Sequence, residues 1–491
     1  MTYPVIFRSE LGNVYVYDYL ANSILHLSER DALTLRKMMR VGTSPRGNPR
    51  RQTKHTNYVD NSSLLKNALA KYAFRGQSNE TKTKEPWFGR VEFNQNIANC
   101  SNLILNITDF CNFSCEYCYY ESALDDRAPR IRREMPFSIA RKAIRYYFNL
   151  SQSRYRISRF GRKTIGFYGG EPVLKFDFIK QCVKFARSLC FQDDLRFNLT
   201  TNGSLLNEEN IKYFIDNNFH LLISLDGPET EHDRCRIDYN GVGTFSRVWR
   251  NLGLLRRINQ RYFANNVRFN SVYTELHNLA AIDSFFEQGF LKRNHVLASK
   301  ASGLEYCKGR LKTARNERLK IFKEEFSELH KEFVSIIVKK KPMHKYLKAL
   351  FYRYYSPLVN RKYVSCNAEP RPPGTTQSLP CFPGSVRLYV TTDGQYHICE
   401  RINNCFPIGN CDDGIEYESV LNVINKFHKQ KGEQCFSCEA KHICQACYAT
   451  FSKKDKFEGE AYCEKIKRSL PDLLSEYVSI MEKGPGLFDR I

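Results

Sequence analysis

Residues 99–300 alternate between short apolar runs rich in β-forming residues and longer amphipathic stretches, and this alternation restricts the fold more than any other feature of the sequence. Strands that alternate with helices form a parallel sheet, because each crossover helix returns the chain to the same starting edge. The sequence therefore predicts an α/β fold for this region. The apolar runs are residues 103–107, 164–168, 195–200, 221–225, 267–272 and 295–298.

The regions on either side of this core differ from it in pattern. Residues 3–20 read as short strands with a turn at Gly12-Asn13, and Ser28 and Asp31 have the spacing of a helix capping box. Two basic helices are expected over 312–355, separated at Pro342. We therefore expect five segments: an N-terminal unit 1–45, a linker 46–98, a core 99–310, a helical bridge 311–365 and a cysteine-rich domain 366–491.

Composition restricts the class of protein and its compartment. The chain of 491 residues has no apolar run long enough to span a membrane, which needs about 18–20 residues, and Arg8, Glu10 and Asp18 interrupt its N-terminal region. We expect a cytoplasmic protein, whose eighteen cysteines stay reduced and are candidate metal or cluster ligands. The net charge of +23 attracts acidic partners, which include nucleic acid, acidic peptide and anionic lipid.

Three cysteines follow the first apolar run of the core: Cys111, Cys115 and Cys118, in a C-x3-C-x2-C arrangement. Three thiolates can hold three irons of a cubane cluster and leave the fourth iron without a protein ligand. That iron can chelate S-adenosylmethionine, whose reductive cleavage yields a 5′-deoxyadenosyl radical. The alternative is buried or zinc-binding cysteines, although zinc usually takes four ligands in paired C-x2-C spacing.

This motif, with an aromatic residue before its last cysteine, resembles the radical S-adenosylmethionine (radical SAM) superfamily. The resemblance implies an open (βα)6 partial barrel with a catalytic [4Fe-4S] cluster, and it extends to motifs at several other strand ends. It assigns the adenine to Tyr117, the methionyl amine to Gly169-Gly170-Glu171-Pro172, and the methionyl carboxylate to Ser224 and Arg236. Asn202 and Asp226 fall at matching strand ends and are expected among the cofactor-binding residues.

A second cysteine constellation lies near the C-terminus. Its C-x2-C pairs alone would fit a zinc knuckle, but the whole set resembles the SPASM extension, which implies two auxiliary [4Fe-4S] clusters. Carried over in order, one cluster takes Cys435, Cys438, Cys444 and Cys463, and the other takes Cys381, Cys399 and Cys447. The last pair has x2 where the family has x3. The second cluster is one ligand short, and Cys366, Cys405, Cys411 or a substrate thiolate could complete it.

Two further predictions concern single residues. Glu400 follows Cys399 where sulfatase-maturing relatives carry an aspartate base, so it is a candidate general base, the alternative being a solvated or ion-paired glutamate. Most of the remaining cysteines are expected to be buried core residues, because free cysteine packs as a small apolar side chain. These are Cys100, Cys182, Cys190, Cys235 and Cys307.

Residues 1–45 resemble the leader-binding winged unit of peptide maturases, which pairs an edge strand with the leader of a precursor. The resemblance implies a ribosomally made peptide as substrate, a flavodoxin or ferredoxin as electron donor, and a thioether bond from Cys as product. The alternatives are a sulfatase-type maturase that forms formylglycine, a carbon–carbon crosslinker and a peptide epimerase. A basic RNA-binding protein with structural metal sites would explain the charge, but no RNA-binding motif is recognisable and nucleic acid is not expected.

Replacing Cys111, Cys115 and Cys118 together by Ala is expected to abolish release of 5′-deoxyadenosine, because the variant has no thiolates for the first cluster. The measurement is chromatography of an anaerobic reaction with S-adenosylmethionine and a reductant. Release at the wild-type rate would contradict the assignment of these three residues.

Overall fold

The computed structural model describes residues 4–19, 22–40, 88–121, 131–153, 163–189, 195–301, 315–361, 381–436 and 438–490. Its centre is a ten-stranded sheet in the order β13-β12-β11-β10-β4-β5-β6-β7-β8-β9. All six apolar runs of the core are confirmed as strands, and each neighbouring pair among them is parallel. They are β4 (Asn102–Thr108), β5 (Lys163–Gly169), β6 (Leu195–Thr201), β7 (Phe219–Ser224), β8 (Val267–Tyr273) and β9 (His295–Lys300).

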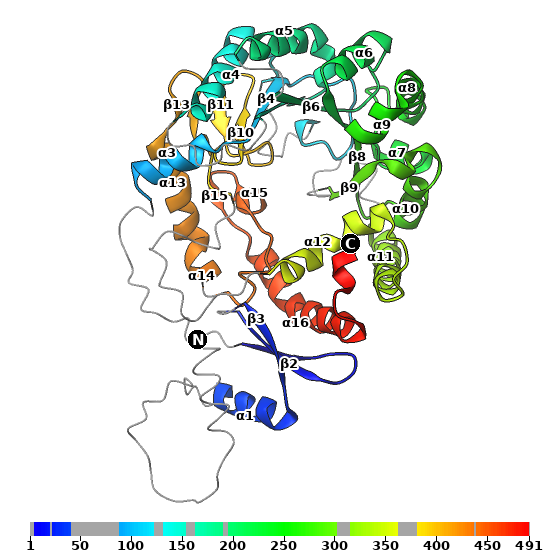
Figure 1. The fold of residues 1–491 in the computed structure, drawn as a ribbon, viewed down its shortest axis with the longest axis vertical. Helices are drawn as coiled ribbons and strands as arrows, with labels where there is room; N and C mark the ends of the chain where they lie inside the picture. The colour runs from blue at the N-terminus through cyan, green and yellow to red at the C-terminus, as the bar shows by residue number, and fades with distance from the viewer. Residues whose placement is uncertain are drawn as a thin grey trace, which may run out of the picture.

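Helices cover the outer face of this curved sheet, as the crossovers require (Figure 1). Several begin at asparagines whose side chains accept a backbone N–H: Asn207 at α6, Asn259 at α9 and Asn278 at α10. The layer consists of α4 (Phe137–Ser151), α5 (Phe176–Arg187), α6 (Glu208–Asp216), α7 (Glu229–Cys235), α8 (Phe245–Ile258), α9 (Gln260–Asn266) and α10 (Leu279–Glu287).

The cysteine-rich region continues the core sheet. Strand β10 (Arg387–Val390) pairs in parallel with β4, from Arg387 opposite Asn102 to Val390 opposite Leu105. Antiparallel strands β11 (Gln395–His397), β12 (Gly409–Asn410) and β13 (Gly414–Ile415) then extend the edge. The C-terminal region is therefore joined to the core by main-chain hydrogen bonds, which its sequence does not reveal.

The rest of the C-terminal half is helical. The two expected basic helices are confirmed as α11 (Arg315–Val338) and α12 (Lys345–Val359), with Pro342 in the break between them. The later elements are α13 (Tyr417–Phe427), α14 (Glu433–Phe436), α15 (Tyr448–Phe451), the hairpin β14 (Ser452–Lys453) and β15 (Lys456–Phe457), and the long helix α16 (Glu460–Lys483).

The N-terminal unit is an antiparallel sheet of β1 (Val5–Arg8), β2 (Val14–Asp18) and β3 (Ser23–Leu27), followed by α1 (Glu29–Arg40). The expected turn lies between β1 and β2, with Gly12 at φ +85°, and Ser28 caps α1 by accepting the N–H of Asp31 at 3.1 Å. One face of the sheet packs on α1 through Val14 and Val16, while its other face joins the main core.

Helix α3 (Arg90–Ala98) occupies the end of the stretch where a linker was predicted. Phe93 and Ile97 are buried in the main core, and Tyr417 donates to the Phe88 carbonyl at 3.0 Å. Weak periodicity hid this helix, because only two of its nine residues are large buried apolar side chains. The helix predicted near residues 64–72 lies outside the described residues, and the predicted segment boundaries stay predictions.

Cys100, Cys182 and Cys235 are buried core residues, as expected, whereas Cys190 and Cys307 lie outside the described residues. None of the helices in the described ranges is both long enough and apolar enough to cross a bilayer.

The aromatic centre of the core makes a quantitative test possible. Phe219 is fully buried, with ring centroids 5.0 Å from Phe214 and 5.2 Å from Phe197. Phe219→Ala is expected to destabilise the protein by about 3–5 kcal/mol, which thermal denaturation measures as a lower melting temperature. Leu297→Ala, on β9 and 47% exposed, is the control and is expected to cost no more than about 0.5 kcal/mol. Equal melting temperatures would contradict this assignment of the core.

Candidate functional site

The loop after β4 holds the three cysteines at the carboxyl edge of the parallel sheet. Main-chain hydrogen bonds anchor it, from Ser114 N to the Ile237 carbonyl at 2.8 Å and from Glu116 N to the Cys235 carbonyl at 2.9 Å. Cys115 is buried, and burial raises the pKa of the Cys111 thiol to about 12. The charge of a Cys118 thiolate raises the pKa of both other thiols, so the three are electrostatic neighbours.

The three thiols are candidate ligands of an iron-sulfur cluster, whose irons are held by Cys thiolates. Within the described ranges, no three Cys, His, Asp or Glu side chains lie close enough together to hold one metal ion. A cubane cluster takes one thiolate per iron and separates them by the width of its core, whereas zinc draws its ligands close around itself. Since metal binding needs thiolates, loading a cluster would release protons from these raised-pKa thiols.

A buried carboxylate connects the cysteine loop to neighbouring strand ends. Asp226 is fully buried and its Oδ2 accepts from Arg236 Nε at 2.8 Å and from the Tyr117 hydroxyl at 2.5 Å. Its Oδ1 accepts the N–H of Val272 on β8 at 2.8 Å. The structure thus brings Tyr117, Asp226 and Arg236 together, and the guanidinium carbon lies 5.4 Å from the Tyr117 ring centroid.

Glu171 fixes the Gly169-Gly170-Glu171-Pro172 loop to the end of β6. Burial raises its pKa to about 7, while its carboxylate accepts from Thr201 Oγ1 at 2.7 Å and from Asn202 N at 2.7 Å. A side chain at Gly170 would come within 2.1 Å of the Phe110 carbonyl oxygen. The glycine therefore allows this loop to pass against the cysteine loop. The carboxylate of Glu171 already accepts hydrogen bonds from other groups of the protein.

Asn202 lies beside the first cysteine. Its amide nitrogen donates to Asn112 Oδ1 at 2.9 Å and lies 4.0 Å from the Cys111 sulfur. Its oxygen accepts from both the N–H and the hydroxyl of Ser204. Ser224 ends β7 on the same edge of the sheet and is half-buried. The sequence did not single out Asn112 or Ser204, which fix the orientation of Asn202.

The remaining conspicuous residues of this edge have structural tasks. Asp233 accepts the backbone N–H groups of Thr244 and Phe245, at 2.7 and 2.8 Å, at the start of α8. His232 is buried between the Asp226 backbone and Thr244, and burial lowers its pKa to about 3. It is therefore neutral at physiological pH.

The C-terminal cysteines fall into two neighbourhoods. Cys435 has Cys463, Cys438 and Cys444 as its electrostatic neighbours, and burial raises its pKa to about 11. Burial raises the pKa of Cys381 and of Cys399, and the charge of Cys447 raises both further. The assignment of these cysteines to two cluster ligand sets stays a prediction. The charge of Cys447 also contributes to the raised pKa of Cys444, so the two sets lie next to each other.

The structure also bears on the missing ligand of the second set. Cys411 has Tyr396, Asp412 and Lys142 as its largest electrostatic neighbours, and its sulfur faces the Ile139 carbonyl. It packs on α4 rather than against Cys381 and Cys399. Cys405 is exposed, and Cys366 lies outside the described residues.

Glu400 forms an ion pair, which the sequence left open as the alternative to a role as general base. Its Oε1 accepts from Arg387 Nη1 at 2.7 Å, while its Oε2 is buried without a hydrogen-bond partner among the described residues. The charge of Glu400 raises the pKa of Arg387, and the charges of Cys399 and Cys381 raise it further. Glu400 thus lies beside the cysteine set, and one of its oxygens remains available to a ligand.

Tyrosines fill the space between the two cysteine regions. Tyr119 and Tyr120 follow Cys118 directly, with ring centroids 4.6 Å apart. The hydroxyls of Tyr120 and Tyr389 on β10 are 3.4 Å apart, and Tyr389 is an electrostatic neighbour of Glu400. The sequence shows the tyrosine pair after Cys118 but not its contact with Tyr389. That contact arises only from the pairing of β4 with β10.

Three neighbouring thiols lie after the first parallel strand. The loops at Gly169-Gly170, Asn202 and Ser224 lie at the ends of the next three strands. The pattern of the radical SAM superfamily matches residues 105–272. The chain contains a radical SAM domain.

Curated relatives of this chain differ from one another in activity. A cysteine-type anaerobic sulfatase-maturating enzyme of Clostridium novyi is 30% identical over 164 residues, which cover 33% of this chain and 42% of that protein. A radical SAM cyclopropyl synthase of Paramaledivibacter caminithermalis is 23% identical, over 44% of this chain and 45% of that one. The matches to these relatives span less than half of the relatives' length.

Solved structures share the fold over a longer range. Native anSMEcpe with bound AdoMet superposes with a TM-score of 0.54 at 20% identity, over 76% of this chain and 98% of that one. The same protein with bound AdoMet and Cp18Cys peptide gives a TM-score of 0.52 over the same shares. At this identity the similarity shows the fold alone.

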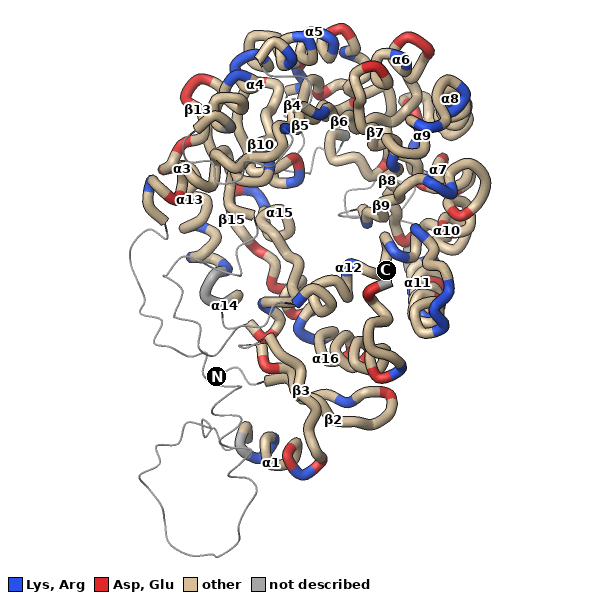
Figure 2. The backbone as a smooth tube through the Cα atoms, viewed as in Figure 1, with Lys and Arg blue, Asp and Glu red and all other residues tan. Residues whose placement is uncertain are grey.

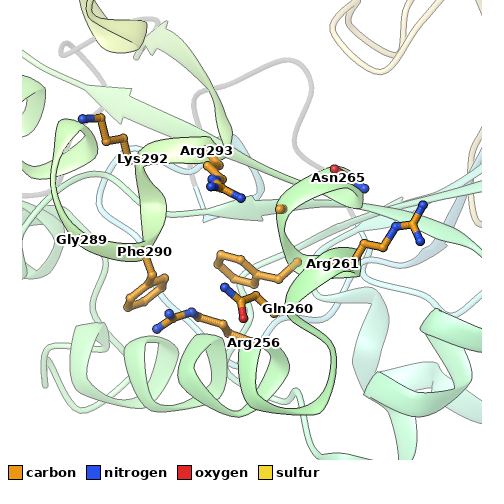
Figure 3. A pocket seen from close by; sticks show the side chains of 10 residues that line it. Arg256, Gln260, Arg261, Asn265, Gly289, Phe290, Lys292 and Arg293 are labelled. Atoms are coloured by element: carbon orange, nitrogen blue, oxygen red, sulfur yellow. The ribbon is translucent and has the colours of Figure 1, made fainter.

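A pocket of about 630 Å³ lies away from the cysteines, between α8, α9 and the turn Gly289–Arg293 (Figure 3). Its lining includes Arg256, Arg261, Lys292 and Arg293 and no carboxylate, with Arg256 5.2 Å from the Phe290 ring centroid. It adjoins the amino ends of β8 and β9, opposite the cysteine loop. Figure 2 shows basic and acidic residues on the outer helices, and this pocket, with four cationic and no carboxylate side chains in its lining, suits an anionic group.

The Glu171 contacts predict the effect of a minimal substitution. Glu171→Gln places an amide N–H where Asn202 N needs an acceptor, and the resulting unsatisfied buried donor is expected to cost about 1–3 kcal/mol. Displacement of Asn202 should also weaken binding of S-adenosylmethionine. Thermal denaturation and calorimetric titration measure the two effects. Glu208→Gln, at an exposed ion pair on α6, is the control, and an unchanged melting temperature for Glu171→Gln would contradict the assigned contacts.

Proposed function

We propose that this protein is a radical SAM maturase that modifies a ribosomally synthesised peptide, forming a thioether bond from a cysteine of that peptide. The observation that carries the proposal is the position of three cysteines in the loop after the first parallel strand, beside the loops that end the next three strands. Cys111, Cys115 and Cys118 would hold the catalytic cluster, and the two C-terminal sets would hold auxiliary clusters.

The cofactor would lie along the carboxyl edge of the sheet. S-adenosylmethionine bound there supplies, after one-electron reduction by a flavodoxin or ferredoxin, the 5′-deoxyadenosyl radical that abstracts a hydrogen atom. The Gly169-Gly170 backbone and Ser224 would orient the methionyl group. Tyr117, held by Asp226, would face the adenine. Arg236 is held through Nε by the same carboxylate, which leaves its other nitrogens to a carboxylate of the cofactor.

Substrate chemistry would take place between the two cysteine regions. Burial around Tyr120, Tyr389 and Cys399 excludes water, which favours directed radical chemistry. Closure of a thioether removes one hydrogen atom by abstraction, one thiol proton and one electron, and an auxiliary cluster held by the C-terminal cysteines would supply the acceptor for that electron. The available oxygen of Glu400 would accept the thiol proton.

A peptide substrate is supported by the N-terminal unit. Strand β3 pairs only with β2 among the described strands, so one edge is open to an added peptide strand. Leu25 is 40% exposed on β3 and offers an apolar contact to the peptide. The structural neighbour anSMEcpe is itself seen with a bound peptide, and the +23 charge of this chain suits an acidic leader.

A sulfatase-type maturase is the second candidate, favoured by the matches to sulfatase-maturating enzymes. It shares the radical step and differs in product, because formylglycine replaces the thiol or hydroxyl by a carbonyl. The glutamate at position 400, where sulfatase-maturing relatives carry an aspartate, and the open β3 edge favour the first candidate.

The proposal predicts different results for the two kinds of cluster. Anaerobically purified protein should contain about twelve irons and release 5′-deoxyadenosine with S-adenosylmethionine and dithionite. Cys438→Ala should still release 5′-deoxyadenosine but lose about four irons and all peptide product. Mass spectrometry of reactions with a synthetic Cys-rich peptide, and with the Cp18Cys peptide, separates thioether from formylglycine. Zinc in place of iron, with no 5′-deoxyadenosine, would overturn the proposal in favour of a metal-stabilised binding protein.

A further inference from the structure

The end of β2 is buried in the C-terminal half of the protein rather than in its own unit. Tyr17, Asp18 and Tyr19 are 0%, 2% and 3% exposed. Tyr17 and Tyr19 belong to the main core, whereas Val14 and Val16 of the same strand belong to the small core under α1. Because strand side chains alternate, β2 faces α1 on one side and the C-terminal domain on the other.

The partner of this buried segment is the loop between Cys438 and Cys444. The Lys441 ammonium lies 5.6 Å from the Tyr19 ring centroid, and the His442 ring hydrogen-bonds to the Tyr19 backbone. Cys438 is an electrostatic neighbour of Tyr17. Each of these contacts joins the N-terminal unit to the loop that carries two of the four cysteines of one set.

Helix α16 holds the same unit from a second side. Glu10 N donates to Ser479 Oγ at 2.8 Å, and the Tyr15 hydroxyl donates to Glu482 at 2.8 Å. The first turn of this helix carries Cys463, another member of the cysteine set. The N-terminal sheet is therefore fastened to two elements that supply cysteines to that set, which a separately tethered leader-binding domain would not require (Figure 1).

We propose that the segment Tyr17 to Tyr19 forms part of the wall around the cysteine set Cys435, Cys438, Cys444 and Cys463. Tyr19 and His442 are then positioning residues for the auxiliary cluster of that set, and the inference rests on the proposed function for the presence of the cluster. Groups that orient and enclose cluster ligands control water access and the redox properties of the iron.

The same contacts connect substrate binding to the cluster. In the β2–β3 register Tyr17 lies opposite Ile24 and Asp18 opposite Ser23. A peptide strand added to β3 would stabilise the strand pair that holds Tyr17, and thereby the wall of the cysteine set. By linkage, occupancy of the set would in turn favour peptide binding by the same factor.

The test uses the reconstituted full-length protein and needs no peptide. Tyr19→Leu and His442→Gln are expected to accelerate transfer of about four of about twelve irons to an excess of bathophenanthroline disulfonate by about tenfold. The electron paramagnetic resonance signal of one reduced cluster should change in both variants. Tyr15→Phe is the matched control, because it removes a hydrogen bond between the same sheet and α16 away from the cysteine loop, and it should behave as wild type.

Wild-type iron transfer and an unchanged resonance signal in both Tyr19→Leu and His442→Gln would overturn the inference. An equal acceleration in Tyr15→Phe would also overturn it, since the effect would then follow general loosening of the interface. Iron transfer is compared between proteins whose circular dichroism spectra and melting temperatures match those of the wild type. If Tyr19→Leu fails to fold, His442→Gln, which retains a hydrogen-bond donor, provides the test. Wild-type protein with only about four irons would instead overturn the proposed auxiliary clusters themselves.

Discussion

Parallel pairing of β4 with both β5 and β10 determines where the chemistry-bearing residues meet. Strand β4 leads into the cysteine loop, β5 leads into the Gly169-Gly170 loop, and β10 leads into a turn whose Thr392 hydroxyl donates to Asp109 at 3.0 Å. Because parallel strands end on the same edge of a sheet, these three segments converge although nearly 300 residues separate the first from the last. Antiparallel β11 then returns the chain, so that Glu400 lies beside Arg387 at the start of β10. The Tyr120–Tyr389 contact across β4 and β10 is a direct result.

Two buried carboxylates then fix the loops at this edge. Asp226 holds Arg236, Tyr117 and the β8 backbone, and Glu171 holds the ends of β5 and β6. Buried carboxylates are costly unless donors surround them, so each is satisfied by several partners from different strands. The result is an edge of the sheet whose side chains are held in fixed positions by hydrogen bonds within the protein.

The C-terminal half belongs to the same body as the radical SAM domain. It extends the sheet through β10, packs on α4 through Cys411 and Tyr396, and carries the N-terminal unit on α16. One large core runs through all of these parts, and only the interface between β2 and α1 forms a separate small core. A peptide held at β3 would therefore be held at a fixed position relative to both auxiliary cysteine sets.

The sequence by itself determined the parallel strands, the helical break at Pro342, the capped first helix and the radical SAM cysteine motif. These features depend on local periodicity and spacing, which a single chain displays directly. Helix α3 was hidden by its weak periodicity, as only Phe93 and Ile97 are large buried side chains.

Only the tertiary structure decided that Arg387 pairs with Glu400, that Asp226 joins Arg236 to Tyr117, and that Tyr19 covers the Cys438–Cys444 loop. Each of these contacts depends on strand neighbours or packed faces that are distant in the chain. Local propensity carries no information about such pairs, because the pairing of β10 with β4 and the docking of β1 on α16 arise from burial of surfaces throughout the molecule.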